Sequence, residues 1–223
     1  MAVIAFDVYG TLVDPAGMVV QLAEPFGAHA AAAAQLWREK QLEFTFRRAL
    51  MRRYVDFDVC TAQALSHVSA QLGVHLDEAG RVALLAAYLR LPCFADVKAA
   101  LETLCEARHK LVALSNGTER AIRTLLRTSG IEAYFADILS ADSVRTFKPD
   151  PAVYALLRRD AEHDGHSTWL VSANPFDVIG AKAAGLSAAW VRRDAARIFD
   201  PWEFQPDMVI GSLEELPGKL AAN

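Results

Sequence analysis

The chain has 223 residues, of which 53% are hydrophobic and 22% charged, and its formal net charge is −4. This composition predicts a soluble globular protein with room for one large domain and a smaller inserted one, and it does not indicate binding to nucleic acid. No apolar run is long enough to cross a membrane, and a strand begins almost at the first residue, so we expect neither membrane association nor a signal peptide.

The predicted elements begin with a short apolar strand at 3–6, which is followed by a long helical region from about Asp14 to Cys93. Residues 29–54 are rich in Ala, Leu and Arg, which predicts one long helix or two. Thr61 is expected to cap a helix that ends at Gly73, and Asp77 to open another that reaches about Leu89.

From Pro92 onward, predicted helices and strands alternate, which indicates a parallel sheet with helices on both faces. The sequence therefore predicts an α/β fold, a Rossmann-like doubly wound parallel sheet at 1–14 and 93–223 with a helical insertion at 15–92. The expected strands are Lys110–Ser115, Ala136–Ser140, Thr168–Ser172, Ser187–Val191 and Met208–Ile210, and the expected helices are Asp96–Arg108, Glu119–Thr128, Pro151–Glu162, Phe176–Ala184 and one capped by Ser212 with Glu215.

Polar residues follow three of these apolar strands. Asp7 closes the first strand, Ser115 and Asn116 close the second, and Ser172 ends the strand that leads toward Asp177. Ligands bind at the carboxyl ends of the strands in open α/β sheets. We therefore expect these side chains to form one site.

The three cysteines, Cys60, Cys93 and Cys105, are an odd number at irregular spacing. They predict reduced core thiols, and with them a cytoplasmic location, because no metal-binding or paired-cysteine pattern is present.

The strand-end Asp7, the strand-end Ser115, Lys148 before a proline and a last acidic loop at Asp177 occur in the order of the four motifs of the haloacid dehalogenase superfamily. The resemblance covers essentially the whole chain. It implies a Rossmann-like core with a helical cap, and a nucleophilic role for the strand-end acid.

Two positions distinguish branches of that superfamily. Its phosphatases carry a second acid two residues after the nucleophile, where this chain has Tyr9. An alkoxide leaving group needs a proton from a general acid, whereas a halide leaves without one, so Tyr9 favours dehalogenation. Ala173 stands where metal-dependent members have an acidic Mg²⁺ ligand, which predicts an enzyme with neither metal nor cofactor.

The inserted region carries a further resemblance. The stretches Trp37–Glu43 and Arg53–Phe57 are similar to two cap segments of the L-2-haloacid dehalogenases (haloacid dehalogenase type II). The first implies that Arg38 reaches into the site to pair with a halide or carboxylate. Glu39 departs from the glutamine that is common there, and it adds an acid near an anionic substrate.

The resemblance implies an (S)-2-haloacid dehalogenase that turns a small 2-haloacid into a 2-hydroxy acid and halide through an ester on Asp7. Homodimers are common among such relatives, so a homodimer is expected. The implied catalytic residues are Asp7, Thr11, Arg38, Ser115, Asn116, Lys148, Ser172, Asn174 and Asp177, and the implied substrate-binding residues are Val8, Tyr9, Leu42, Phe57, Tyr154 and Phe176.

Two alternatives stay open at the level of sequence. One is another hydrolase on the same scaffold, either a small phosphatase or an enzyme that opens azetidine carboxylates. The other is a binding protein without catalysis, which Asp7, Lys148 and Asp177 argue against because all three are retained.

Overall fold

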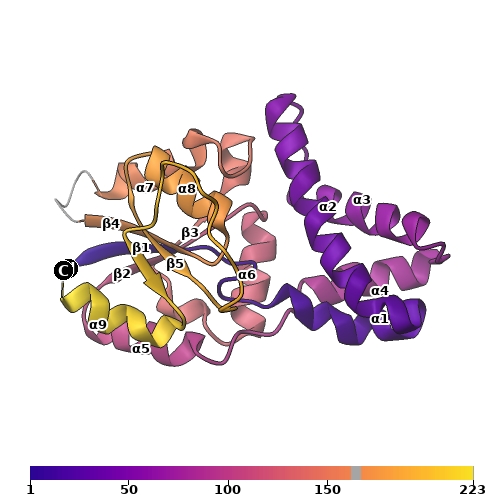
Figure 1. Cartoon of the computed structure of the whole chain (residues 1–223), viewed down its shortest axis with the longest axis horizontal. Coiled ribbons are helices and arrows are strands. Elements are labelled where there is room, and N and C mark those ends of the chain that lie inside the picture. The colour runs from indigo at the N-terminus through magenta and orange to yellow at the C-terminus, as the bar shows by residue number, and fades with distance from the viewer. Residues whose placement is uncertain (162–166, 223) are drawn as a thin grey trace.

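Six parallel strands form a single sheet in the order β3-β2-β1-β4-β5-β6 (Figure 1). The computed structural model describes residues 1–161 and 167–222. This arrangement confirms the predicted doubly wound α/β fold. The strands are β1 (Ala2–Phe6), β2 (Lys110–Ser115), β3 (Asp137–Ser140), β4 (Ser167–Ser172), β5 (Ser187–Val191) and β6 (Met208–Ile210).

The first strand lies at the centre of the sheet, and every one of its residues is buried. Phe6 pairs with Ala113 of β2 on one side and with Val171 of β4 on the other. The backbone N–H of Asp7 continues the ladder by donating to the carbonyl of Val171 at 3.0 Å. This register brings the carboxyl ends of three strands together around Asp7.

Helices cover both faces of the sheet, because side chains alternate between the two faces along each strand. Ile4 and Phe6 of β1 belong to the core on one face, and Val3 and Ala5 belong to the core on the other. The first core includes side chains of α5 (Val97–Glu106), α6 (Glu119–Thr128) and α9 (Leu216–Ala221), and the second includes side chains of α7 (Pro151–Ala161) and α8 (Pro175–Ala183).

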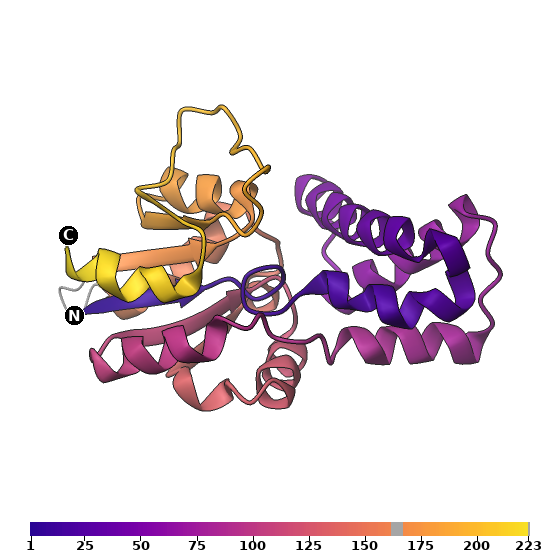
Figure 2. The ribbon, with the colours of Figure 1, turned by 60° about the horizontal axis from the view of Figure 1, so that its bottom comes forward.

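Four helices stand to one side of the sheet, beyond the carboxyl end of β1, in both views of the molecule (Figures 1 and 2). The chain leaves and re-enters the sheet region along neighbouring paths. The N–H of Asp14 donates to the carbonyl of Pro92 at 2.8 Å, and the N–H of Phe94 donates to that of Leu12 at 3.1 Å. The helices are α1 (Met18–Phe26), α2 (Ala30–Leu50), α3 (Phe57–Gln71) and α4 (Glu78–Tyr88).

Most of the predicted elements are confirmed within one or two residues, and residues 29–54 contain one long helix rather than two. The helix predicted from Pro151 ends its described part at Ala161, and Glu162 lies outside the described residues. None of the helices described for this chain is long and apolar enough to span a membrane.

The predicted cap at Thr61 is wrong. Helix α3 begins four residues earlier, at Phe57, and the Thr61 hydroxyl donates to the Phe57 carbonyl at 2.9 Å. A threonine hydroxyl can bond either to a helix N-terminus or to the carbonyl one turn back, and buried Phe57 and Cys60 extend the apolar face upstream. The prediction of core thiols holds for Cys60 alone, since Cys93 and Cys105 are only partly buried, although all three are free.

Helices α7 and α8 approach closely at Gly180, beside the loop that carries Lys148. A methyl group on Gly180 would lie 2.6 Å from Cβ of Pro149 and 2.8 Å from Cε2 of Tyr154. Only a residue without a side chain fits this contact. The glycine therefore fixes how near α8 comes to the loop that carries Lys148.

Gly180→Ala should lower the free energy of unfolding by about 1–3 kcal/mol through overpacking. The matched control is Gly218→Ala in α9, where the added methyl group meets nothing within 4 Å; alanine there should be neutral, or stabilising by up to ~1 kcal/mol. Urea unfolding of both variants measures this. Equal stability of the two would contradict the close contact at Gly180.

Candidate active site

The site is assembled around the Asp7 carboxylate, which is only 6% exposed. Its Oδ2 atom accepts hydrogen bonds from the Thr11 hydroxyl at 3.0 Å, the Asn174 amide at 2.7 Å and the Ser172 hydroxyl at 3.4 Å. Its Oδ1 atom accepts from the Lys148 ammonium at 3.0 Å. These donors on both oxygens fix the plane of the carboxylate.

Two of those donors are themselves held by the backbone. The Thr11 hydroxyl accepts from the N–H of Ala173 at 2.9 Å, and the Ser172 hydroxyl accepts from the N–H of Asn174 at 3.1 Å. Because each hydroxyl oxygen accepts from a backbone N–H of the loop after β4, its own proton is left to point toward Asp7. These bonds join Asp7, Thr11 and the loop after β4 into one hydrogen-bonded unit.

Lys148 lies between two acidic side chains, and its own side chain is 1% exposed. All three ammonium protons have acceptors: Asp7 Oδ1, Asp177 Oδ2 at 2.8 Å and the Leu114 carbonyl at 2.7 Å. Burial on its own would lower the pKa of this ammonium, but the carboxylates of Asp177 and Asp7 outweigh burial and raise the pKa. Lys148 is therefore a fixed cation.

The backbone of this lysine is held as well. The N–H of Lys148 donates to the Asn116 side-chain carbonyl at 2.8 Å, and the Ser115 hydroxyl accepts from the N–H of Gly117 at 3.2 Å. Ser115 and Asn116 are both buried. In this structure they shape the end of β2 and the lysine loop, and neither makes a hydrogen bond to Asp7 that the structure records.

Asp177 is completely buried in the first turn of α8. One carboxylate oxygen accepts from Lys148, and the other accepts from the Tyr154 hydroxyl at 2.9 Å. Burial raises the pKa of Asp177 more than the Lys148 charge lowers it. An acid with a raised pKa is suited to accept a proton from water near neutral pH.

Tyr154, which was expected to bind substrate, donates from its hydroxyl to the Asp177 carboxylate. Its side chain is fully buried, and its hydroxyl also donates to the Asp177 backbone carbonyl at 3.2 Å. Burial, together with the adjacent acid, raises the pKa of Tyr154 well above its usual value. The tyrosine therefore orients Asp177 as a neutral hydrogen-bond donor.

The helical region contributes Arg38 from α2. The guanidinium donates to the Tyr9 carbonyl at 3.2 Å and lies 5.8 Å from the centre of the Tyr9 ring. That same carbonyl accepts from the Asn174 amide at 3.0 Å, so one backbone oxygen joins Arg38 to a donor of Asp7. The Tyr9 ring packs 5.3 Å from Phe57 and 5.8 Å from Tyr88.

The remaining predicted substrate-binding residues lie in different places: Leu42 borders a cleft, Phe176 lines another hollow with Phe46, and Val8 belongs to the core. A cleft of about 580 Å³ is bordered by both parts of the chain, including Arg38, Leu42 and Asn174, with Glu39 at its side. Phe176 packs edge-on against Phe46 of α2 at 5.1 Å. Val8 is buried, and its carbonyl accepts three backbone N–H groups of the turn that follows, those of Thr11, Leu12 and Val13.

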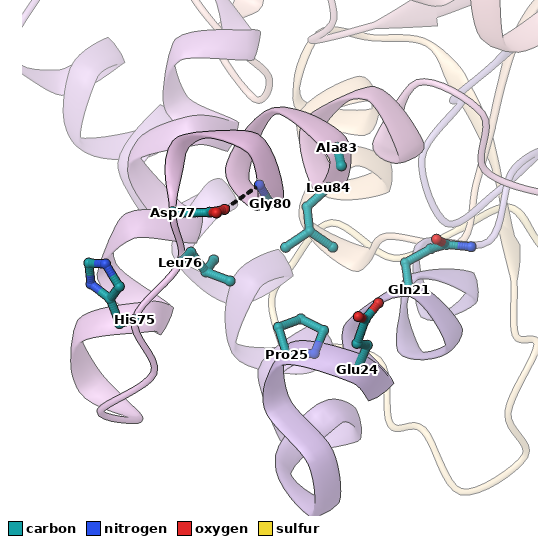
Figure 3. Close-up of a pocket in the computed structure, with 9 residues that line it drawn as sticks. All are labelled: Gln21, Glu24, Pro25, His75, Leu76, Asp77, Gly80, Ala83 and Leu84. Atoms are coloured by element: carbon teal, nitrogen blue, oxygen red, sulfur yellow. Dashed lines mark hydrogen bonds between the residues drawn. The ribbon is translucent and has the colours of Figure 1, made fainter.

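A hollow of similar size, about 570 Å³, lies between α1 and the start of α4 (Figure 3). The Asp77 carboxylate there accepts from the N–H of Gly80 at 2.7 Å and caps α4. None of the predicted site residues lines this hollow. The cleft beside Arg38 and Asn174 is therefore the candidate substrate site.

Two polar residues of this region escaped the sequence analysis. Gln41 and Tyr88 are buried, and their side chains meet Arg38 and Tyr9. The available signal was the position of Gln41, because it falls four residues after Trp37 on the buried face of α2. A polar residue on an apolar stripe indicates a specific hydrogen-bonding role.

The position of Lys148 also bears on whether the two acids could bind a metal ion. Its ammonium occupies the space between Asp7 and Asp177, and Tyr9 and Ala173 supply no carboxylate beside them. Across 1–161 and 167–222, no group of three or more His, Cys, Asp or Glu residues could hold a metal ion. The residues present therefore do not fit a Mg²⁺ site, since that ion needs several oxygen ligands.

Lys148→Met should lower the free energy of unfolding at pH 7 by about 3–5 kcal/mol, because it leaves two buried carboxylates without a counterion. Burial and Asp7 then raise the pKa of Asp177 unopposed, above the ordinary value of 3.8. The folded state binds a proton that the unfolded chain lacks, so the deficit should shrink as the pH falls toward 5.

Urea unfolding at pH 7 and pH 5 measures that difference. The control is Lys182→Met, which breaks the more exposed pair with Asp207 and should cost about 0–1 kcal/mol at both pH values. A deficit for Lys148→Met that stays constant or grows on acidification would contradict the charge arrangement described above.

Comparison with known proteins places this geometry in a family. The model of the haloacid dehalogenase-like hydrolases matches residues 1–185. An (S)-2-haloacid dehalogenase from Pseudomonas sp. (strain YL) is 38% identical over 94% of this chain and 90% of its own length. Haloacetate dehalogenase H-2 from Moraxella sp. (strain B) is 36% identical over 98% and 97%.

Solved structures agree. The L-2-haloacid dehalogenase of Xanthobacter autotrophicus matches with a TM-score of 0.90 at 32% identity, over 99% of both chains. The same enzyme with chloropropionic acid covalently bound matches with a TM-score of 0.89, at 32% identity and the same coverage. The chain belongs to the haloacid dehalogenase-like hydrolase family, within the group of the L-2-haloacid dehalogenases.

Proposed function

We propose that Asp7 is the nucleophile of an (S)-2-haloacid dehalogenase, a hydrolase that acts on carbon–halogen bonds. The observation that carries the proposal is the Asp7 carboxylate itself, which is held on both oxygens by Thr11, Asn174 and Lys148. Of these donors, Asn174 also borders the cleft. Such a carboxylate loses little freedom when it attacks, because its orientation is already set. Covalently bound chloropropionic acid in the Xanthobacter enzyme supports this route.

In the first step an Asp7 oxygen attacks C2 of the haloacid from the side opposite the halogen. A carbon–oxygen bond forms, the carbon–halogen bond breaks, and the halide leaves with the bonding electrons. Arg38 stabilises the leaving anion, and the rings of Tyr9 and Phe57 form the wall beside it. The configuration at C2 is inverted.

In the second step water attacks the carbonyl carbon of the Asp7 ester. Asp177 accepts a proton from that water, which its raised pKa favours. The ester bond to the 2-hydroxy acid breaks, and the departing oxygen takes back the proton that Asp177 accepted. The second proton of the water is released to solvent, which restores the Asp7 carboxylate. Lys148 is the shared counterion of the two acids, and it stays paired with Asp177 while Asp7 is esterified.

The helical segment at 15–92 supplies Arg38 and Phe57, and we propose that it acts as a cap over the strand ends. A closed cap excludes bulk water, which strengthens an attacking carboxylate by removing its hydration shell. Glu39 accepts a hydrogen bond from Gln35 at 2.8 Å along the same helix, which keeps its carboxylate engaged on α2. The expected homodimer and cytoplasmic location stay predictions.

Tyr9 weighs against a phosphatase. Burial, chiefly, raises its pKa well above the usual value for a phenol, so it gives up its proton poorly. A phosphate ester would need a general acid at this position. The Arg38 guanidinium next to the Tyr9 ring instead offers a cation beside an aromatic surface, which suits a halide as the leaving group.

A substrate panel tests the function. The protein should release halide from L-2-chloropropionate and should leave the D enantiomer unchanged. With the halogen at Arg38 and C2 facing Asp7, the D enantiomer would exchange the positions of its carboxylate and methyl groups. Halide is followed with an ion-selective electrode, and p-nitrophenyl phosphate and azetidine-2-carboxylate serve as competing substrate classes. Phosphate release or ring opening without halide release would overturn the assignment.

Activity should be unchanged after exhaustive EDTA treatment, because the Lys148 ammonium already lies between the paired acids as their counterion. Halide release is compared before and after treatment, and again after Mg²⁺ is added back. Loss of activity that Mg²⁺ restores would show that the carboxylates hold a metal.

Asp177→Asn should accumulate the ester, because displacement does not need a base at this position whereas hydrolysis does. Mass spectrometry of the Asp7 peptide after a single exposure to L-2-chloropropionate should show the added acyl mass. Asp137→Asn at the start of β3 is the control and should turn over without accumulation. An Asp177→Asn enzyme that releases product at the wild-type rate would remove Asp177 from the hydrolytic step.

A further inference from the structure

Gln41 is a fully buried polar residue in the helical segment. Its Oε1 atom accepts two hydrogen bonds, from the Arg38 guanidinium at 2.8 Å and from the Tyr88 hydroxyl at 2.9 Å. Its amide nitrogen donates to the Thr61 hydroxyl at 2.5 Å. A buried amide with partners at both ends has a single orientation, since a flip would set donor against donor.

Those partners come from three helices. Arg38 and Gln41 lie on α2, Thr61 lies on α3 and Tyr88 lies on α4. Thr61 in turn donates to the Phe57 carbonyl at 2.9 Å. One side chain therefore connects the guanidinium of the cleft to the first residue of α3, whose ring packs on Tyr9.

Arg38 is held at a small number of points in the described structure. Its guanidinium donates to Gln41 and to the Tyr9 carbonyl, one bond from each terminal nitrogen, and it also lies beside the Tyr88 hydroxyl. The Tyr9 contact belongs to the floor of the site, and the Gln41 contact belongs to the helical segment. Removing the Gln41 contact would leave the guanidinium with the Tyr9 carbonyl and with Tyr88, whose hydroxyl would lose its Gln41 acceptor at the same time.

We propose that Gln41 is a positioning residue that sets the Arg38 guanidinium where the halide departs. This inference rests on the proposed function and adds to it the group that fixes the leaving-group site. Gln41 stabilises the transition state through Arg38, without contacting the substrate. Its loss should therefore matter more for chloride than for bromide, because chloride is the poorer leaving group.

The test measures the single-turnover rate of halide release from L-2-chloropropionate and L-2-bromopropionate. Gln41→Met keeps the length of the side chain and removes its hydrogen bonds. It should slow chloride release by about 10²-fold, which is the effect expected when a catalytic group is misplaced by about 1 Å. Bromide release should be slowed less. The ratio of the bromide rate to the chloride rate therefore rises.

Gln41→Glu is the second variant, for use if the first does not fold. It keeps an acceptor for Arg38 and Tyr88, and it places a negative charge beside the guanidinium, so the same ratio should rise. The matched control is Gln63→Met, which removes an exposed Arg–Gln hydrogen bond to Arg48 of 3.1 Å. This control should leave both rates unchanged.

A double-mutant cycle with Arg38→Ala separates positioning from general destabilisation. If Gln41 acts through Arg38, Gln41→Met should slow the Arg38→Ala enzyme no further. Equal slowing of chloride and bromide release by Gln41→Met would overturn the inference. So would rate effects of the two substitutions that multiply in the double variant. In either case, halide release by the wild-type protein would leave the proposed function intact. A wild-type protein that releases no halide would overturn the proposed function first.

Discussion

The structure depends on one buried ammonium group. The Lys148 ammonium donates to Asp7 at the end of β1 and to Asp177 on α8, and it also donates to the Leu114 carbonyl of β2. Neither Asp7 nor Asp177 could stay buried next to the other without it, because the cost of burying like charges is large. The lysine therefore makes it possible to hold the attacking group and the hydrolytic base within one small volume.

The nucleophile and the group for the leaving halide come from different parts of the molecule. The sheet holds Asp7 rigidly, because β1 is buried between two parallel neighbours and its carboxylate meets donors from the loop after β4. The helical segment adds a cation and aromatic rings. The Tyr9 carbonyl lies where the two meet, accepting from Asn174 on one side and from Arg38 on the other. A displacement of the sheet edge or of the helical segment would therefore alter a hydrogen bond to the same Tyr9 oxygen.

The sequence was sufficient for the elements that follow simple patterns. The strand that ends at Asp7 and the strand that ends at Ser172 could be predicted, because apolar runs with polar ends are typical of parallel sheets. Thr61 could not be placed, since its hydroxyl serves equally at a helix start or one turn inside. The hydrogen bond from Tyr154 to Asp177 could not be predicted, because residue type does not reveal which acid a phenol will meet.

Gln41 shows the limit more sharply. It is predictable as a buried position from its spacing on α2, but its partners come from α3 and α4, and only the packing of three helices brings them together. Hydrogen-bond networks of this kind depend on tertiary contacts that a local pattern does not contain. The strand-end residues of the site could be predicted from the sequence, whereas the hydrogen bonds that orient Arg38 and Asp177 could not.

The central claim is that Asp7 forms a covalent ester, and oxygen labelling tests it most directly. In H₂¹⁸O with enzyme in excess over an L-2-haloacid, the hydroxyl oxygen of the first product comes from Asp7 and the solvent oxygen enters the carboxylate. The account predicts unlabelled 2-hydroxy acid in the first turnover and label in the Asp7 peptide by mass spectrometry. Label in the hydroxyl group of that first product, with none on Asp7, would mean that water attacks the substrate directly and would contradict the account.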